Sequence, residues 1–298
     1  MKIKKDKILN HFFCFGLGFS GSALGQSLIR DGWKVSGTTR DPKKLKTLEK
    51  EGFNTFFFPG EDCLIEEQIF SSTHVMITIP PQCTIDIIFK KFRNAIIQSE
   101  NLRWLGYLSS TGVYGNHDGE WVDETSNLLP NTERNCSRLE IENQWLQLNR
   151  EEKVGVHIFR PAGIYGPGRN VLETVKLGRG KRINKKGQIN NRIHVDDLIK
   201  TLKASMKRPN PGSIYNVCDD EPAASKEVVE FACKLLKIDL PKERSFNKAE
   251  FSEMAQTFYL DNKKIRNEKI KSELKIKLKY PNYREGLKSI FLNFKTQS

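Results

Sequence analysis

The sequence predicts an α/β fold in which a parallel sheet carries helices on both faces. Two observations support this class. Short apolar runs typical of buried strands alternate with stretches of helical periodicity along the first half of the chain, and the first apolar run leads directly into a glycine-rich turn. Strands that alternate with helices at this spacing pair in parallel, because each helix returns the chain to the start of the next strand.

The expected elements cover most of the chain. Strands are expected at residues 8–15, 33–38, 55–58, 74–79, 104–109, 154–159 and 213–217, and helices at residues 22–31, 42–51, 85–97, 134–149, 171–177, 195–206 and 225–236. No internal repeat and no Gly/Ser-rich or Pro-rich linker is visible. We therefore expect one continuous unit. Residues 1–162 would form the main domain, and residues 163–298 would complete the sheet and add a smaller α+β lobe.

The charge balance is strongly basic. The 298 residues include 49 Lys and Arg against 36 Asp and Glu, a formal net charge of +13. Such a balance suits nucleic acid, a membrane surface or a polyphosphate ligand. The lysines are spread over the whole chain, with a denser run at residues 263–279, and no nucleic-acid-binding module is recognisable. A lysine-rich solvated surface explains this pattern better than nucleic-acid binding does.

Targeting, membrane and metal signals are weak. Glycines interrupt the apolar stretch at residues 12–19, which argues against a signal peptide over residues 1–25. No run approaches the roughly 20 apolar residues of a membrane span. The six cysteines form no Cys-x-x-Cys pair, and no histidine pair has the spacing of metal ligands. We therefore expect a reduced, cytoplasmic protein without a metal site or a membrane partner.

The strongest local signal is the segment from Gly16 to Gly21, which follows an apolar strand and opens a helix. In this Gly-x-Gly-x-x-Gly context, Gly16 would make the tight turn, Gly18 would let a pyrophosphate approach the backbone, and Gly21 would let the helix pack closely on the strand. Phe19 and Ser20 would lie beside the phosphates at the helix N-terminus. The segment predicts a dinucleotide site on a Rossmann, doubly wound parallel sheet.

The end of the second strand selects the cofactor. An NAD site usually places an acidic residue there to accept hydrogen bonds from the ribose. This chain has Thr39 followed by Arg40, whose guanidinium suits a 2′-phosphate, with Lys43 and Lys44 close behind. The pattern favours NADP(H) over NAD(H). NAD(H) stays open if Asp41 turns toward the ribose.

Further motifs carry a family resemblance. In addition to the glycine loop, the chain contains Ser109-Ser110-Thr111-Gly112-Val113-Tyr114-Gly115, Arg160-Pro161-Ala162-Gly163-Ile164-Tyr165-Gly166-Pro167-Gly168, Arg192-Ile193-His194-Val195-Asp196-Asp197 and Tyr215-Asn216-Val217. In this order, the motifs resemble the extended short-chain dehydrogenase/reductase superfamily, in its NAD-dependent epimerase/dehydratase-like branch. The resemblance covers nearly the whole chain. It implies an NAD(P)-binding Rossmann domain followed by a substrate-binding lobe.

The resemblance also implies contacts for the rest of the cofactor. Ile79 and Pro80 would line it with their backbone, and Ser109 would lie at the end of a neighbouring strand. Pro161 and Gly163 would lie beside the nicotinamide, where a backbone N–H of this segment commonly meets the carboxamide. All of these residues follow predicted strands, whose carboxyl ends collect ligands in open parallel sheets.

The family's catalytic pattern is incomplete. Ser110 matches the serine that orients the substrate oxygen, but arginines, Arg134 and Arg138, stand where the family has a tyrosine and a lysine. An arginine cannot donate a proton at neutral pH, although Arg138 could hold ribose or phosphates. Tyr114 is a candidate proton donor in a rearranged site, and a structural role suits it as well. The literal Tyr-x-x-x-Lys match ending at Lys263 lies far along the chain and is readily explained by chance.

These features predict an NADP(H)-binding oxidoreductase or epimerase-like protein of the atypical short-chain dehydrogenase type. Its substrate would be a small polar or nucleotide-linked molecule. The alternative is a non-catalytic NADP(H)-binding sensor or scaffold, and nucleic-acid binding is a weaker third reading. A homodimer could form through the helices expected at residues 85–97 and 134–149.

Overall fold

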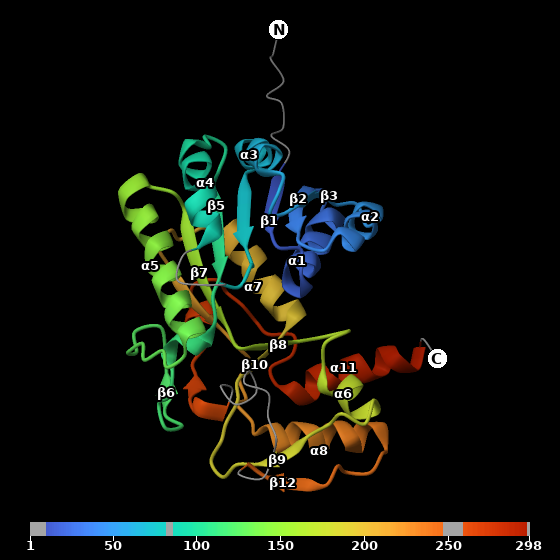
Figure 1. The fold of residues 1–298 in the computed structure, drawn as a ribbon. Coiled ribbons are helices and arrows are strands. Elements are labelled where there is room, and N and C mark those ends of the chain that lie inside the picture. The colour runs from blue at the N-terminus through green and yellow to red at the C-terminus, as the bar shows by residue number, and fades with distance from the viewer. Residues whose placement is uncertain (1–9, 82–85, 247–258, 297–298) are drawn as a thin grey trace. The chain divides into compact units, whose positions relative to one another are not determined.

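A computed structural model describes residues 10–81, 86–246 and 259–296 (Figure 1). Its main sheet has seven strands in the order β11-β7-β5-β4-β1-β2-β3. The strands are β1 (His11–Phe15), β2 (Lys34–Thr39), β3 (Asn54–Phe57), β4 (His74–Ile77), β5 (Trp104–Leu108), β7 (Val156–Pro161) and β11 (Ile214–Val217). The strands from β5 through β3 pair in parallel, as in β1 against β2 and β4. The predicted α/β class with a parallel Rossmann-like sheet is confirmed.

The chain forms two compact units that alternate along the sequence. The first comprises residues 1–109, 140–158 and 206–213, and the second comprises residues 110–139, 159–205 and 214–298. Helices α5 (Glu133–Glu152) and α7 (Val195–Lys207) and strand β7 contribute residues to both units. The domain boundary expected near residue 162 stays a prediction.

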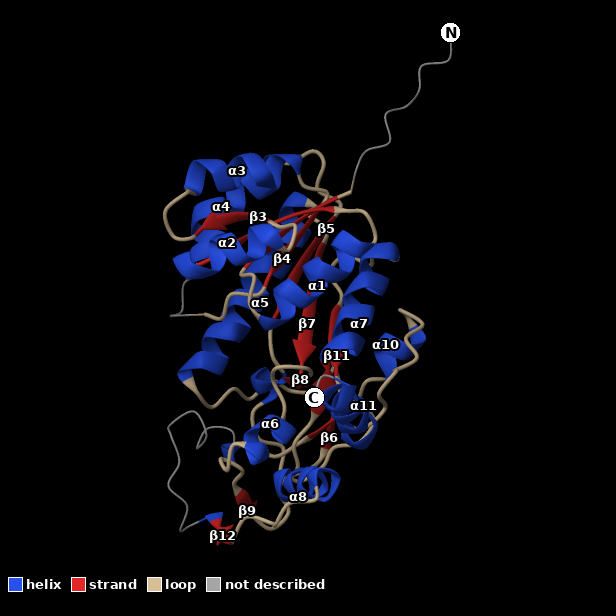
Figure 2. Ribbon diagram, turned by 90° about the vertical axis from the view of Figure 1, so that its right-hand side faces the viewer, coloured by secondary structure: helices blue, strands red, loops and turns tan. Residues whose placement is uncertain are grey.

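The first unit contains the helices that follow the first four strands. They are α1 (Phe19–Arg30), α2 (Pro42–Lys50), α3 (Asp62–Ser71) and α4 (Ile87–Gln98). Helix α1 contacts β1 and β2, α2 contacts β2 and β3, and α3 contacts β1 and α4 (Figure 2). Helix α3 was not predicted from the sequence because its apolar residues do not gather on one face, and Leu64 and Phe70 are exposed. Only Ile65 and Ile69 are buried on it.

The core of the first unit is aromatic. Every residue of β1 is buried, as the uninterrupted apolar run predicts for a central strand. The ring of Phe15 lies 4.9 Å from that of Phe13 and 5.2 Å from that of Phe92, between centroids. These contacts fix the strand that leads into the glycine loop.

The second unit is built from short elements. Parallel two-stranded pairs form between β10 (Arg192–His194) and β8 (Gly163–Tyr165), β12 (Glu243–Ser245) and β9 (Arg182–Asn184), and β13 (Lys264–Ile265) and β6 (Trp121–Val122). Its helical elements are η1 (Thr111–Tyr114), α6 (Val171–Lys176), α8 (Ser225–Leu236), α10 (Glu268–Ser272) and α11 (Tyr283–Thr296). Helix α8 packs against α6 and α11. Within the described ranges, no helix combines the length and apolarity needed to cross a membrane.

Candidate functional site

The glycine loop has the backbone geometry that its sequence predicts. Gly16 has a φ of 99°, a conformation that favours glycine. Two threonines hold it in place, one in β2 and one directly after β4. The N–H of Gly16 donates to Thr38 Oγ1 at 3.0 Å, and Thr78 Oγ1 donates to the carbonyl of Gly16 at 2.6 Å. The sequence reasoning missed both threonines, because their roles depend on pairing between strands far apart in the chain.

Gly18 and Gly21 differ in how much space surrounds them. A Cβ atom on Gly21 would lie 2.3 Å from the carbonyl oxygen of Gly16, so only glycine lets α1 pack this closely on the loop. A Cβ atom on Gly18 would meet nothing within 4 Å. Gly18 is also the N-cap of α1 and offers no side-chain cap to the first turn. Open space beside N–H groups at a helix N-terminus suits the pyrophosphate of a dinucleotide.

The end of β2 presents a basic surface. Thr39 is buried, and its Oγ1 accepts a hydrogen bond from the N–H of Asp41. The Asp41 carboxylate is the N-cap of α2 and accepts from the N–H of Lys43 at 3.0 Å. Arg40 is exposed, as are Lys43 and Lys44. The acidic side chain in this segment is therefore engaged in helix capping, while the basic ones are accessible.

The second unit contains a cavity of about 510 Å³. This volume is in the range of small-molecule sites. Residues from several segments of the unit line it: Ser110, Thr111, Gly112, Thr132, Arg134, Asn135, Arg138, Ala162, Gly163, Arg169, Ile189, Asn190, Asn191, Asp261 and Lys263. Most of the lining residues are polar or charged by type, with one carboxylate among four cationic side chains.

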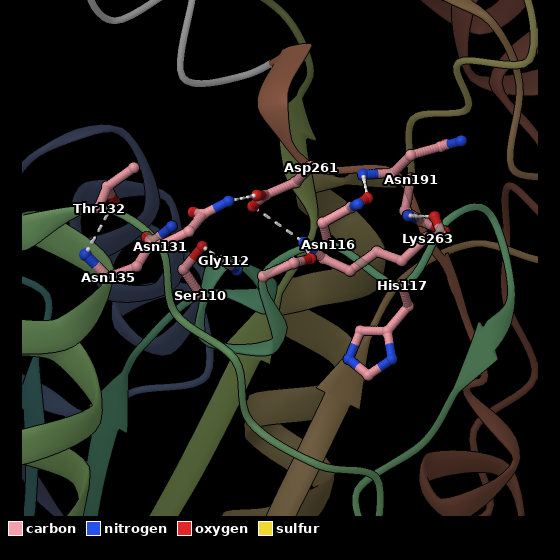
Figure 3. A network of polar contacts seen from close by, with 12 residues as sticks. Ser110, Gly112, Asn116, His117, Asn131, Thr132, Asn135, Asn191, Asp261 and Lys263 are labelled. Carbon is pink, nitrogen blue, oxygen red and sulfur yellow. Dashed lines mark hydrogen bonds and ion pairs between the residues drawn. The ribbon is translucent and has the colours of Figure 1, made fainter.

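A buried ion pair forms one side of this cavity (Figure 3). Lys263 Nζ donates to the carbonyl of Gly115 at 2.6 Å and to Asp261 Oδ2 at 3.1 Å. Asn131 Nδ2 donates to the other oxygen of Asp261 at 2.6 Å. Burial lowers the pKa of the Lys263 ammonium, and the Asp261 carboxylate opposes part of that effect. Each oxygen of Asp261 thus has a donor.

The predicted catalytic residues all lie in the second unit, but only Ser110 and Arg138 line the cavity. Ser110 Oγ accepts from the N–H of Gly112 at 3.1 Å. Tyr114 is fully buried, and its hydroxyl donates to Asn216 Oδ1 at 2.8 Å and accepts from Arg160 Nη1 at 3.0 Å. Burial raises the pKa of Tyr114 to about 12, with Arg160 opposing the shift. A catalytic role for these residues stays a prediction.

The predicted cofactor residues divide between the units. Gly16, Gly18, Phe19, Ser20, Gly21, Thr39, Arg40, Ile79, Pro80 and Ser109 belong to the first unit, and Pro161 and Gly163 belong to the second. The backbone N–H of Ala162 donates to Val217 at 3.0 Å, and that of Gly163 donates to Asn191 at 3.1 Å. Both donors of this segment are therefore engaged, and a nicotinamide carboxamide would need another partner. That all these residues contact one cofactor stays a prediction.

Several cavity residues were not predicted as site residues from the sequence. Lys263 was noticed through its Tyr-x-x-x-Lys spacing, but it was not assigned to the site because it lies far from Ser110 along the chain. Asp261, Asn191 and Arg169 carried no signal of their own. Lys263 directly precedes β13, which pairs with β6, and its Nζ donates to Gly115, so the fold joins segments about 150 residues apart.

The parallel sheet and the glycine loop define an NAD(P)-binding Rossmann protein. The chain matches the NAD dependent epimerase/dehydratase family over residues 94–218. It is similar to a conserved protein of unknown function from Silicibacter pomeroyi DSS, with 40% identity and a TM-score of 0.89 over 96% of this chain and 99% of the other. It is also 26% identical to Protein YeeZ of Escherichia coli K12, over 77% of this chain and 85% of YeeZ.

The protein belongs to the NAD dependent epimerase/dehydratase family. Its fold is shared by more distant structures. One is a dTDP-glucose 4,6-dehydratase from Bacillus anthracis str. Ames, in complex with NAD. It is 18% identical, with a TM-score of 0.77 over 97% of both chains.

Proposed function

We propose that the protein is an NADP(H)-dependent enzyme of the oxidoreductase or epimerase type, acting in the cytoplasm on a small polar or nucleotide-linked substrate. One observation carries the cofactor assignment. At the end of β2, Arg40 is exposed beside Lys43 and Lys44, while Asp41 is the N-cap of α2. Asp41 uses Oδ1 to cap α2, and the accessible guanidinium of Arg40 suits a 2′-phosphate.

The glycine loop supports dinucleotide binding in general. The positive φ of Gly16 and the open space beside Gly18 suit a backbone that a pyrophosphate approaches closely. Helix α1 begins at Phe19, directly after the loop, and its first N–H groups carry partial positive charge. This part of the proposal does not depend on which of the two dinucleotides binds.

A bound nicotinamide supplies the hydride acceptor or donor of such a reaction. The chain would supply orientation and protons. Ser110 Oγ accepts from Gly112 and keeps its own proton for a substrate oxygen. Lys263 Nζ has three protons and uses two of them on Gly115 and Asp261. Arg134 and Arg138 bind and orient, because guanidinium groups keep their protons at neutral pH.

A non-catalytic NADP(H) sensor or scaffold is the second candidate. The arginines at positions 134 and 138 favour it, because the resemblance places the proton-transferring tyrosine and lysine there. Turnover of any carbonyl compound with NADPH would argue against this candidate. NADPH binding without turnover on a broad carbonyl panel would favour it.

Calorimetric titration of the full chain with NADPH and NADH tests the cofactor assignment. We expect NADPH to bind more tightly than NADH. Replacing Arg40 by alanine removes charge-assisted hydrogen bonds of about 1.5–3 kcal/mol, so NADPH affinity should fall roughly 10- to 100-fold. NADH affinity should change little.

The matched control is Arg30→Ala, which removes an exposed arginine at the opposite end of α1. It should leave the affinity for both nucleotides unchanged. Equal losses in Arg30→Ala and Arg40→Ala would indicate a general charge effect. Failure of the unaltered chain to bind either nucleotide would overturn the proposed function.

A further inference from the structure

We propose that Lys263 is the catalytic residue that gives a proton to the substrate oxygen in the cavity of the second unit, and that the substrate is a carbonyl compound or the corresponding alcohol. This inference rests on the proposed function, which supplies the hydride. The placement of Lys263 rests on the second unit alone. It assigns to a lysine the proton transfer that guanidinium groups at positions 134 and 138 cannot carry out.

The ammonium group of Lys263 is held by two acceptors. Lys263 directly precedes β13, is buried and lines the cavity. Its Nζ donates to the carbonyl of Gly115 at 2.6 Å and to Asp261 Oδ2 at 3.1 Å. These are its two acceptors among the described residues, and an ammonium has three N–H groups, so one is left for a ligand. The two bonds fix the position of Nζ, as transfer to a substrate oxygen requires.

Hydrogen bonds from other loops hold the segment that carries Lys263 in place (Figure 3). Asn191 Nδ2 donates to the carbonyl of Lys263 at 2.9 Å, and Gln188 Nε2 donates to the carbonyl of Asp261 at 2.7 Å. Asn131 Nδ2 donates to Asp261 Oδ1 at 2.6 Å. The ammonium and its carboxylate partner are therefore fixed before a substrate arrives. Donors fixed in this way need no rearrangement during the reaction, which favours catalysis.

Burial makes Lys263 a better proton donor than an exposed lysine. It lowers the pKa of the ammonium toward neutral pH, although the Asp261 carboxylate opposes part of the shift. Proton transfer is most efficient when the pKa of the donor lies near the working pH. The other cationic side chains of the lining are Arg134, Arg138 and Arg169, whose guanidinium groups keep their protons. Among the cationic lining residues that the structure describes, only Lys263 can therefore release a proton.

The proton balance at the substrate oxygen closes in both directions. In reduction, hydride adds to the carbonyl carbon, an O–H bond forms as an Nζ–H bond of Lys263 breaks, and the neutral amine then takes a proton from water. In oxidation, the neutral amine removes the hydroxyl proton as hydride leaves the carbon. Ser110 lines the same cavity and accepts from Gly112, so its own proton can stabilise the charge that develops on the substrate oxygen.

Tyr259, the tyrosine of the literal Tyr-x-x-x-Lys spacing, has different neighbours. Its ring lies 5.3 Å from that of Phe246, between centroids. Burial raises the pKa of its hydroxyl, and a hydrogen bond with Ser225 opposes the shift. None of these three residues lines the cavity. Lys263 would thus transfer the proton itself rather than assist a tyrosine.

Competitive labelling of the full chain with acetic anhydride, read by mass spectrometry, tests whether the Lys263 amine is open to small molecules and has a lowered pKa. The internal reference is Lys264, which is half-buried, lies outside the lining and has its Nζ 5.5 Å from the ring centroid of Trp121. Only neutral amines react, so the labelling ratio of Lys263 to Lys264 should fall as the pH rises from about 7.5 to 10, by about 10-fold for each unit between the two pKa values. No labelling of Lys263, or a ratio independent of pH, would overturn the inference.

Turnover of a panel of aldehydes and ketones with NADPH tests the role in catalysis. For any compound that the unaltered chain reduces, Lys263→Gln should lower kcat about 100-fold or more, and the control Lys264→Gln should leave it unchanged. Lys263→Arg keeps the positive charge and should retain the stability of the unaltered chain in urea denaturation, but it should not restore turnover. Full turnover in Lys263→Gln would overturn the inference.

NADPH titrations separate the two proposals. Lys263→Gln should bind NADPH as tightly as the unaltered chain does. NADPH binding without reduction of any compound on the panel would overturn the proton-transfer role and leave the cofactor assignment intact. Failure to bind NADPH would overturn the proposed function, whereas the labelling ratio would still report on Lys263.

Discussion

Tyr114 was a candidate proton donor from its place in the sequence, but its surroundings in the structure are those of a buried structural residue. Its ring is fully buried, and the guanidinium of Arg160 lies 5.0 Å from the ring centroid. Arg160 is itself 1% exposed and donates to the tyrosine hydroxyl. A buried guanidinium needs acceptors, so the hydroxyl group stabilises a charge that burial would otherwise make unfavourable.

Replacing Tyr114 by phenylalanine should therefore reduce stability. Loss of the hydroxyl leaves Arg160 and Asn216 with fewer partners, at a cost of about 1–3 kcal/mol in the free energy of unfolding. Urea denaturation followed by circular dichroism measures this loss. NADPH affinity should be unchanged in the folded variant. A variant of normal stability without activity would instead support Tyr114 as a proton donor.

Among the elements, helix α4 depends on one buried carboxylate. Asp86 is its N-cap, and Oδ1 accepts from the N–H of Ile88 at 2.8 Å. The other oxygen, Oδ2, accepts from Nε1 of the fully buried Trp145 in α5 at 2.8 Å. Asp41 has the corresponding capping role on α2 without a second buried partner. The two caps form a natural comparison.

Asp86→Ala should destabilise the protein more than Asp41→Ala does. Each variant loses a cap that contributes about 1 kcal/mol. Asp86→Ala also leaves the Trp145 N–H unsatisfied, which adds about 1–3 kcal/mol. Chemical denaturation of both variants measures the difference. Equal losses would mean that the Trp145 hydrogen bond contributes nothing.

Elements with strong periodicity could be predicted from the sequence, and those without it could not. Strands β1 and β4 and helix α8 were found because apolar runs and helical spacing mark them clearly. Helix α3 buries only two apolar side chains, and strand pairs such as β6 with β13 are too short for a pattern. The same limit applies to the site. Gly16 could be predicted from its motif. Thr38 and Lys263 could not, because they form hydrogen bonds with Gly16 and Gly115, which are distant in the sequence.

For the molecule as a whole, the buried histidines make the folding stability sensitive to acid. Four of the five are buried: His11, His74, His157 and His194. Burial lowers the pKa of each from 6.5 to about 4. Neighbouring aromatic rings reinforce the apolar surroundings, since His74 lies 4.8 Å from Trp33 and 6.2 Å from Trp104 between ring centroids.

The direction in which pH changes the stability follows from comparing the protons bound by the folded and the unfolded chain. Between pH 6.5 and about 4 the unfolded chain binds a proton at His74 and the folded chain does not. The stabilising contribution of the neutral imidazole is thus present above pH 6.5 and lost as the pH falls toward 4, by up to about 1.4 kcal/mol per pH unit. Asp219 titrates with the opposite sign, because burial raises its pKa to about 8.

A comparison with His74→Phe isolates the histidine from Asp219, which is present in both proteins. The unaltered chain should lose stability relative to the variant as the pH falls from 7 to 4.5. Urea denaturation at several pH values measures this difference. A difference independent of pH would contradict the assigned protonation of His74.

The alternation of the two units along the chain has a consequence for synthesis on the ribosome. The first unit includes residues 206–213, so it is incomplete until 213 of the 298 residues have been made. Before β7 has been made, β5 has an unpaired edge, and after that β7 has an unpaired edge until β11 has been made. Unpaired strand edges on a nascent chain readily pair with other chains. The interval between translating Leu108 and Val217 is therefore when this protein would most need a chaperone.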